Sequence, residues 1–395
     1  MKITRSSTIH SLILAAALSI GLGFVSPVSA KEHSYIVDLN SKTATALGSL
    51  GMGGTIAEGI NDSGQVVGYS PTDTIWGLEN HAFITGPNGK GMTDIGNFGG
   101  INNSYAPGIN ATGQVVVNSL GFSPGVGTYS YAYISGPNGV GMTDLGSLGG
   151  GGSSAKGIND AGQVVGMSLT GPGEQLAFIT GPNGVGMTDL GSLGGGGSSA
   201  NGINDAGQVV GYSNTDQLRQ KEPGEGAGER HAFITGPHGV GMTDLGTLDG
   251  SYFSVANGIN DAGRVVGNST TAVWDEQHAF ITGPNGVGMT DLGTLGGSES
   301  IANGINEAGQ VVGHSDTAAG VQHAFITGPN GVGMTDLNSL INVPGIILTD
   351  VTAINNHGQI LATGVMGVVP EPETYAMLLA GLGLLGFIAR CRKTA

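Results

Sequence analysis

Short apolar segments alternate with tight turns through most of the chain, and four such segments make one unit. The first ends at the Ile of Gly-Ile-Asn, the second is Gln-Val-Val-Gly, the third is Ala-Phe-Ile and the fourth is Met-Thr-Asp-Leu. Asn-Asp-Ala-Gly joins the first two and Gly-Pro-Asn-Gly joins the last two, and both are typical of tight hairpin turns. Adjacent apolar residues such as Val66 and Val67 break strict alternation, which indicates strands in sheets that are covered on both faces.

The unit recurs along the whole middle of the chain. The Gly-Ile-Asn phrase occurs seven times, once as Ala-Ile-Asn, at spacings of 45 to 56 residues. Four strands in about 49 residues are typical of one propeller blade, because stacked blades cover both faces of each sheet. The asparagines of this phrase are Asn61, Asn110, Asn159, Asn204, Asn260, Asn306 and Asn355.

The phrase counts favour a closed ring. Only six complete pairs of Ala-Phe-Ile and Met-Thr-Asp-Leu, or their variants, accompany the seven Gly-Ile-Asn phrases, and the missing piece appears near the start as Tyr35-Ile36-Val37-Asp38-Leu39. We therefore predict an all-β fold, a propeller of about seven four-stranded blades. Its last blade takes its inner and middle strands from 350–364 and one outer strand from 34–39. An open β-solenoid is the alternative.

The repeat phrases also carry a resemblance. His-Ala-Phe, Thr-Asp-Leu-Gly and Gly-Ile-Asn-Asp-Ala-Gly-Gln-Val-Val-Gly resemble the HAF family of extracellular repeats over nearly all of 34–364. The resemblance implies an exported repeat protein and no defined activity.

The N-terminus has the features of a secretory signal peptide. Lys2 and Arg5 give a positive start, an apolar stretch follows from Leu12 to Phe24, and small residues precede the expected cleavage between Ala30 and Lys31. We expect residues 1–30 to be removed on export.

The C-terminal residues 369–395 form a second address signal. Pro370, Glu371 and Pro372 keep the chain extended, an apolar stretch runs from 376 to 389, and a basic cluster closes the chain at Arg390, Arg392 and Lys393. A helix over this stretch falls short of a bilayer's hydrocarbon core, and flanking basic residues reach the interface. The cationic end stays cytoplasmic, so the rest of the chain lies outside.

This tail resembles the PEP-CTERM sorting signal of Gram-negative bacteria. The resemblance implies an exosortase as partner, a membrane-tethered intermediate, removal of the transmembrane helix, and a host that makes exopolysaccharide or biofilm matrix. An ordinary membrane anchor is the alternative. The predicted domains are a signal peptide at 1–30, the propeller at 31–368 and the sorting signal at 369–395.

The charge of the middle region limits the classes of binding partner, and the cysteine content limits the possible disulfides. Once the two cations of the signal peptide and the three cations and two acids of the tail are set aside, 8 basic and 27 acidic residues remain, a net charge of −19. Such a surface repels nucleic acid. Cys391 is the single cysteine, so no internal disulfide forms.

Two recurrent side chains are candidates for chemistry. Histidine opens the Ala-Phe-Ile phrase in four units, but Tyr131 and Leu176 replace it in two, so a hydrogen bond at the blade edge is favoured over metal binding. Aspartate recurs in Met-Thr-Asp-Leu, with Asp38 counted as a seventh member. It suits either a turn-capping role, which we favour, or a ring of Ca²⁺ ligands. The asparagine of Gly-Ile-Asn is also interpreted as structural.

The loops between second and third strands vary most. One carries the insertion 214–230, and two others carry Trp76 and Trp274, which suit stacking on sugar rings if exposed and packing on the blade if not. No catalytic constellation is evident, so we expect a non-catalytic surface or matrix protein at the cell surface. The alternatives are a carbohydrate-binding propeller that uses these loops, and an enzyme acting on polysaccharide.

Overall fold

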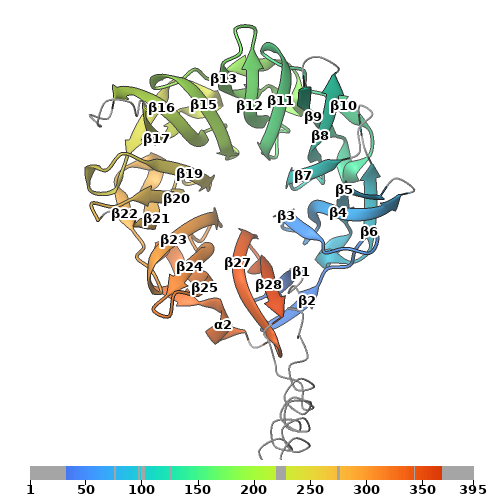
Figure 1. Ribbon diagram of the computed structural model, residues 1–395, viewed down its shortest axis with the longest axis vertical. Coiled ribbons are helices and arrows are strands. Elements are labelled where there is room, and N and C mark those ends of the chain that lie inside the picture. The colour runs from blue at the N-terminus through green and yellow to red at the C-terminus, as the bar shows by residue number, and fades with distance from the viewer. Residues whose placement is uncertain are drawn as a thin grey trace, which may run out of the picture. The chain divides into compact units, whose positions relative to one another are not determined.

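A computed structural model describes residues 33–74, 77–96, 98, 103–123, 127–218, 228–273, 276–341 and 343–366. These residues form seven four-stranded antiparallel sheets arranged around a central axis (Figure 1). One parallel pair, Gln277 with Glu299, links two of the sheets at a single point. The chain is therefore a seven-bladed β-propeller.

Each blade runs from an inner strand to an outer strand, and the blades are numbered here from the first complete one. Blade 1 contains β3 (Ile56–Ile60), β4 (Val66–Thr74), β5 (Gly77–Thr85) and β6 (Met92–Gly96); blade 2 contains β7 (Ser104–Ile109), β8 (Val115–Ser123), β9 (Gly127–Ser135) and β10 (Met142–Asp144); blade 3 contains β11 (Gly149–Ile158), β12 (Val164–Thr170), β13 (Gln175–Thr180) and β14 (Met187–Asp189). Blade 4 contains β15 (Gly194–Ile203), β16 (Val209–Leu218), β17 (Gly228–Thr235) and β18 (Met242–Gly246); blade 5 contains β19 (Ser254–Ile259), β20 (Val265–Thr270), β21 (Gln277–Thr282) and β22 (Met289–Asp291); blade 6 contains β23 (Gly296–Ile305), β24 (Val311–Thr317), β25 (Gln322–Thr327) and β26 (Met334–Asp336).

Blade 7 closes the ring with strands from both ends of the described chain. The inner strands are β27 (Ile346–Ile354) and β28 (Gln359–Met366), and the outer ones are β1 (His33–Asp38) and β2 (Thr43–Ala46). The pairing of β1 with β28 runs from His33 opposite Gly364 to Asp38 opposite Gln359. The predicted sharing of this blade is confirmed, with one correction: the N-terminal region supplies two strands rather than one.

The turns adopt the geometry that their residues allow. In the turn between β3 and β4, Gly64 has φ +74°, and in the turn between β5 and β6 Asn88 has φ +57°. Asparagine tolerates this left-handed conformation better than most residues, and glycine adopts it without steric cost. The second turn forms a short 3₁₀ helix, η1 (Pro87–Gly89), which recurs as η2 (Pro137–Gly139), η3 (Pro182–Gly184), η4 (Pro237–Gly239), η6 (Pro284–Gly286) and η7 (Pro329–Gly331).

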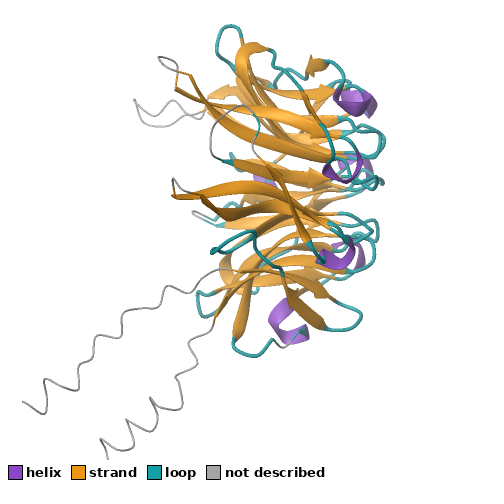
Figure 2. Ribbon diagram, turned by 90° about the vertical axis from the view of Figure 1, so that its right-hand side faces the viewer, coloured by secondary structure: helices purple, strands orange, loops and turns teal. Residues whose placement is uncertain are grey.

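The two hairpin turns of a blade lie on one face of the propeller. Gly89 N–H donates to the Gly64 carbonyl at 3.0 Å, which joins the two turns of blade 1, and Figure 2 shows the short helices along one side. We call this the turn face. The opposite face carries the connections between second and third strands, and we call it the loop face. Because β28 leaves the turn face at Gly358, both His33 and Met366 lie at the loop face.

The hydrophobic core is divided among the spaces between blades. In one space, Val116 and Ile134 of blade 2 pack against Val164 and Phe178 of blade 3. Equivalent phenylalanines fill other spaces and are fully buried, at positions 83, 233, 280 and 325. Two further elements, η5 (Leu248–Gly250) and α2 (Leu337–Leu340), lie between blades along the chain and were not predicted.

Candidate functional site

The recurrent histidine and aspartate form a pair within each blade that has both. His81 Nδ1 lies 2.8 Å from Asp94 Oδ2, and the same contact joins His231 to Asp244 at 2.8 Å. His278 with Asp291 and His323 with Asp336 complete the set. The hydrogen bond that the sequence predicted for the histidine is therefore present.

The aspartate has a second contact that does not depend on the histidine. Asp144 and Asp189, whose blades carry Tyr131 and Leu176, still accept a hydrogen bond from the backbone N–H two residues later, at 2.8 and 2.7 Å. The carboxylate caps this turn, as its favoured interpretation requires. Asp38 also accepts from the backbone N–H two residues later, that of Asn40 at 2.8 Å, so its turn-capping role is present. It lies in β1, the third strand of its blade rather than the fourth, so its position differs from that of the other six.

The invariant asparagines form a closed ring around the axis at the turn face. Asn61 Nδ2 donates to the Asn110 carbonyl at 3.0 Å, and this contact repeats from blade to blade until Asn355 Nδ2 donates to the Asn61 carbonyl at 3.1 Å. The intermediate donors are Asn110, Asn159, Asn204, Asn260 and Asn306. Each amide thus links two blades, and the ring ties the seven sheets together.

Carboxylates follow this ring at the mouth of the central cavity, which has a volume of about 230 Å³. Asp205 Oδ1 accepts from Asp160 N–H, and Glu307 accepts from Asp261 N–H. Burial raises the pKa of Asp205 and of Glu307, and the neighbouring carboxylates raise both further. Among the described residues, no cluster of three His, Cys, Asp or Glu side chains has the geometry to hold a metal ion.

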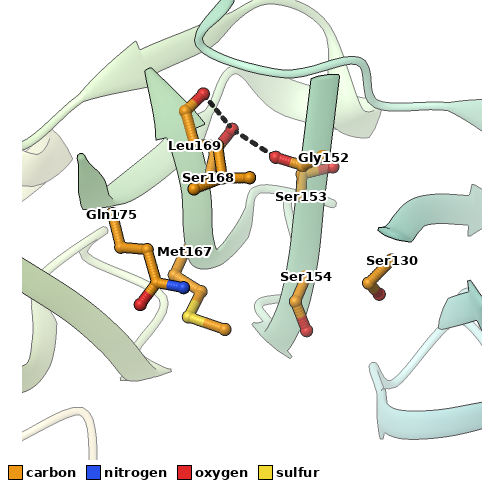
Figure 3. Close-up of a pocket in the computed structure, with 8 residues that line it drawn as sticks. All are labelled: Ser130, Gly152, Ser153, Ser154, Met167, Ser168, Leu169 and Gln175. Atoms are coloured by element: carbon orange, nitrogen blue, oxygen red, sulfur yellow. Dashed lines mark hydrogen bonds between the residues drawn. The ribbon is translucent and has the colours of Figure 1, made fainter. Parts of the chain in front are cut away.

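Clefts open between neighbouring blades. The cleft between blades 2 and 3 has a volume of about 170 Å³ and is lined by neutral side chains such as Ser130, Met167 and Gln175 (Figure 3). Ser168 Oγ there donates to the Gly152 carbonyl at 3.0 Å. None of the described residues that line this cleft is charged.

The corresponding cleft between blades 1 and 2 is larger and chemically different. It has a volume of about 430 Å³ and is lined by Glu58, Tyr69, Asn80, Asn103, Ser104, Tyr105 and Leu120. Burial raises the pKa of Glu58 to about 7. Its Oε2 atom is buried without a hydrogen-bond partner. A buried carboxylate without a partner is costly, so this position demands a functional explanation.

Sequence reasoning missed this cleft, although a signal was present. Glu58 precedes Gly-Ile-Asn, at a position where three other units have Asn201, Asn257 and Asn303. Glutamate in place of asparagine distinguishes this unit from those three, but only the fold shows that Glu58 lines the same cleft as Tyr105 of the next blade.

Several predicted sites fall outside the described residues. These are Trp76 and Trp274, the cleavage site at Ala30 and Lys31, the motif Pro370, Glu371 and Pro372, and the basic cluster Arg390, Arg392 and Lys393. Within the described part of the chain, no helix is long and apolar enough to cross a bilayer. The predicted sorting helix at 376–389 lies outside that part.

Comparison with known proteins identifies the tail. Residues 368–393 match the PEP-CTERM protein-sorting motif. The motif implies an exported protein that is processed by an exosortase. No curated protein matches the chain in sequence.

Solved structures with a similar fold include propellers of distant sequence. TolB from Acinetobacter baumannii is 9% identical, with a TM-score of 0.44, and covers 93% of this chain and 72% of its own. A putative TolB from Agrobacterium tumefaciens is 12% identical, with a TM-score of 0.43, and the match covers 86% of this chain and 100% of that one. The β-propeller domain of the Trilobed protease from Pyrococcus furiosus is 8% identical, with a TM-score of 0.49, and the match covers 80% of this chain and 90% of that one.

Proposed function

We propose that this chain is a non-catalytic propeller that is exported, released from its membrane tether by an exosortase, and held in the exopolysaccharide at the cell surface. The observation that carries the proposal is the sorting motif at 368–393. The signal-peptide features at the N-terminus and the likeness of the repeats to HAF extracellular repeats support it. The acidic, disulfide-free middle suits a protein that relies on packing and hydrogen bonds outside the cell.

The point where the tail begins supports a tethered intermediate. β28 ends at Met366 on the loop face, and the sorting motif follows directly in the chain. An anchor at this end leaves the turn face, with its asparagine ring, on the side away from the attachment point. Residues 31–368 then form the released product.

Replacement of Pro370, Glu371 and Pro372 by alanine tests the export route. We expect the variant to accumulate uncleaved in the inner membrane, measured by immunoblotting of fractionated cells. Glu174→Ala, which removes one exposed charge from blade 3, is the control and should be processed normally. Unchanged release of the triple variant would mean that the tail is only an anchor.

Binding of carbohydrate is the second candidate, and the cleft of about 430 Å³ between blades 1 and 2 favours it, since small-molecule sites occupy roughly 300–1,000 Å³. We expect Trp76→Ala or Trp274→Ala to weaken retention on the polysaccharide of the host. If the unaltered protein is not retained, carbohydrate binding is excluded. The non-catalytic assignment is tested by the release of reducing ends from a polysaccharide panel, and any sustained release contradicts it.

A further inference from the structure

Equivalent positions in the seven blades show how this propeller fills the clefts on its loop face. Residue 201 of blade 4 occupies the place of Glu58, and Asn201 Nδ2 donates to the Ala256 carbonyl of the next blade at 2.8 Å. Asn257 makes the same contact with the Ala302 carbonyl at 2.9 Å. Glu58 in its ionised form has no hydrogen to donate to the next blade, and its Oε2 is left without a partner.

The cleft between blades 4 and 5 contains a cation supplied by the protein. Arg230 lies with its guanidinium carbon 4.4 Å from the centre of the Tyr212 ring, and it lies 6.0 Å from the ring of Phe253. This arrangement is a cation–π contact. In the cleft between blades 6 and 7, His314 Nδ1 likewise lies 2.9 Å from Asp350.

Blade 1 has a tyrosine at the same position, and an asparagine stands where blade 4 has the arginine. Tyr69 pairs with Ala82 in the register in which Tyr212 pairs with Ala232, so the two tyrosines are equivalent. Asn80 precedes His81 as Arg230 precedes His231, and both make an isolated parallel bridge to the next blade, Asn80 with Asn103. A short asparagine therefore replaces the arginine at this cleft.

The result is a cavity with an acid and two aromatic rings. Glu58, Tyr69 and Tyr105 line the space of about 430 Å³, and none of the seven lining residues is basic. The Asn80 N–H donates to Asn103 Oδ1 at 2.9 Å and the Leu120 N–H donates to the Asn103 carbonyl at 3.0 Å, so hydrogen bonds fix the cleft wall.

We propose that the cleft between blades 1 and 2 binds the ammonium group of an amino sugar, a hexosamine residue with a free amine. The carboxylate of Glu58 supplies the counter-charge and the two tyrosine rings supply aromatic faces, which attract cations and stack on the C–H faces of a sugar ring. The volume accommodates more than the ammonium group alone. The proposal rests on the proposed function in one respect only, namely that the exopolysaccharide is the source of the amino sugar.

Calorimetric titration of the full-length chain in detergent tests the site with glucosamine, N-acetylglucosamine and choline. We expect glucosamine and choline to bind and N-acetylglucosamine, whose nitrogen is neutral, to bind at least tenfold more weakly. Choline keeps its charge at every pH, so its affinity should rise roughly tenfold or more between pH 5 and pH 8 as Glu58 ionises. Equal affinity for the amine and its acetylated form contradicts the proposal.

Three variants assign the binding to this cleft. Glu58→Gln removes the counter-charge and should weaken choline binding roughly tenfold or more, whereas Glu174→Gln removes an exposed charge in blade 3 and should change nothing. Asn80→Arg copies Arg230 and should fill the cavity, abolish binding and raise the melting temperature. A folded Asn80→Arg protein that binds choline as before overturns the assignment.

Failure of this site and failure of the proposed function give different results. Retention on the host polysaccharide that is unchanged by Glu58→Gln contradicts the site and leaves the exported matrix role intact. Binding of glucosamine without retention on the polysaccharide supports the site and contradicts the matrix role. If choline binds and glucosamine does not, the site takes organic cations other than amino sugars, and the proposal is wrong.

Discussion

Truncation of one asparagine in the central ring tests how the blades are joined. Asn204 is 4% exposed and makes three hydrogen bonds with its side chain. Its Nδ2 donates to Gln208 Oε1 at 2.9 Å and to the Asn260 carbonyl of the next blade at 3.1 Å, and its Oδ1 accepts from Gln208 N–H at 2.9 Å. Asn204→Ala removes all three and leaves their partners buried.

The expected loss follows from these contacts. Each net hydrogen bond contributes about 1 kcal/mol, so Asn204→Ala should lower the free energy of unfolding by about 3 kcal/mol. Asn257→Ala is the matched control, because this partly buried asparagine of the next blade makes one side-chain hydrogen bond, to the Ala302 carbonyl at 2.9 Å. Its loss should be about 1 kcal/mol.

Urea unfolding followed by circular dichroism measures both variants. We expect Asn204→Ala to shift the urea midpoint clearly further than Asn257→Ala while the slope stays constant, since a constant slope means that the surface exposed on unfolding is unchanged. Equal shifts for the two variants, or a midpoint for Asn204→Ala at the wild-type value, would refute the structural role of the ring.

Three further predictions concern single side chains. The pKa of Glu58 is raised from 4.5 to about 7, so between these pH values the folded state keeps a proton that the unfolded chain has lost. The free energy of unfolding should therefore fall by about 3 kcal/mol as pH rises from 4.5 to 7. Glu58→Gln should abolish this fall, measured as urea midpoints at each pH. The hydrogen bond that His231 donates to Asp244 raises the pKa of His231, so its stabilisation is complete below the unfolded pKa and is lost as pH rises through the folded pKa. Asp244→Asn should remove this dependence, which at a partly exposed pair amounts to under about 1 kcal/mol. Arg230→Asn should lower the melting temperature by removing a contact of about 1 kcal/mol over Tyr212, and an unchanged melting curve would contradict that contact.

Much of the fold follows from the repeat itself. Gly64 and Asn88 mark turns because few other residues adopt positive φ cheaply, and both stand where the hairpins reverse. The apolar pair Val66 and Val67 is buried on both sides, as the break in alternation predicted. The count of phrases predicted a shared last blade, but it missed β2, because Thr43–Ala46 lacks the Met-Thr-Asp phrase.

The candidate site was less predictable from the sequence. A contact between Glu58 and the residues of the next blade depends on strand register across a blade boundary, which repeat spacing does not reveal. The pairing of His81 with Asp94 joins residues 13 apart. A structural role was favoured for each residue over metal binding, but the sequence did not show that the two contact each other. The asparagine ring was interpreted as structural, but its closure from Asn355 to Asn61 required the fold.

The mass of the protein recovered from outside the cells tests the central claim most directly. We predict a chain that begins at Lys31 and ends near Pro370, and so lacks both the signal peptide and the sorting helix. A mass that retains residues 376–393, or recovery of the protein only in the inner membrane, would contradict export and release.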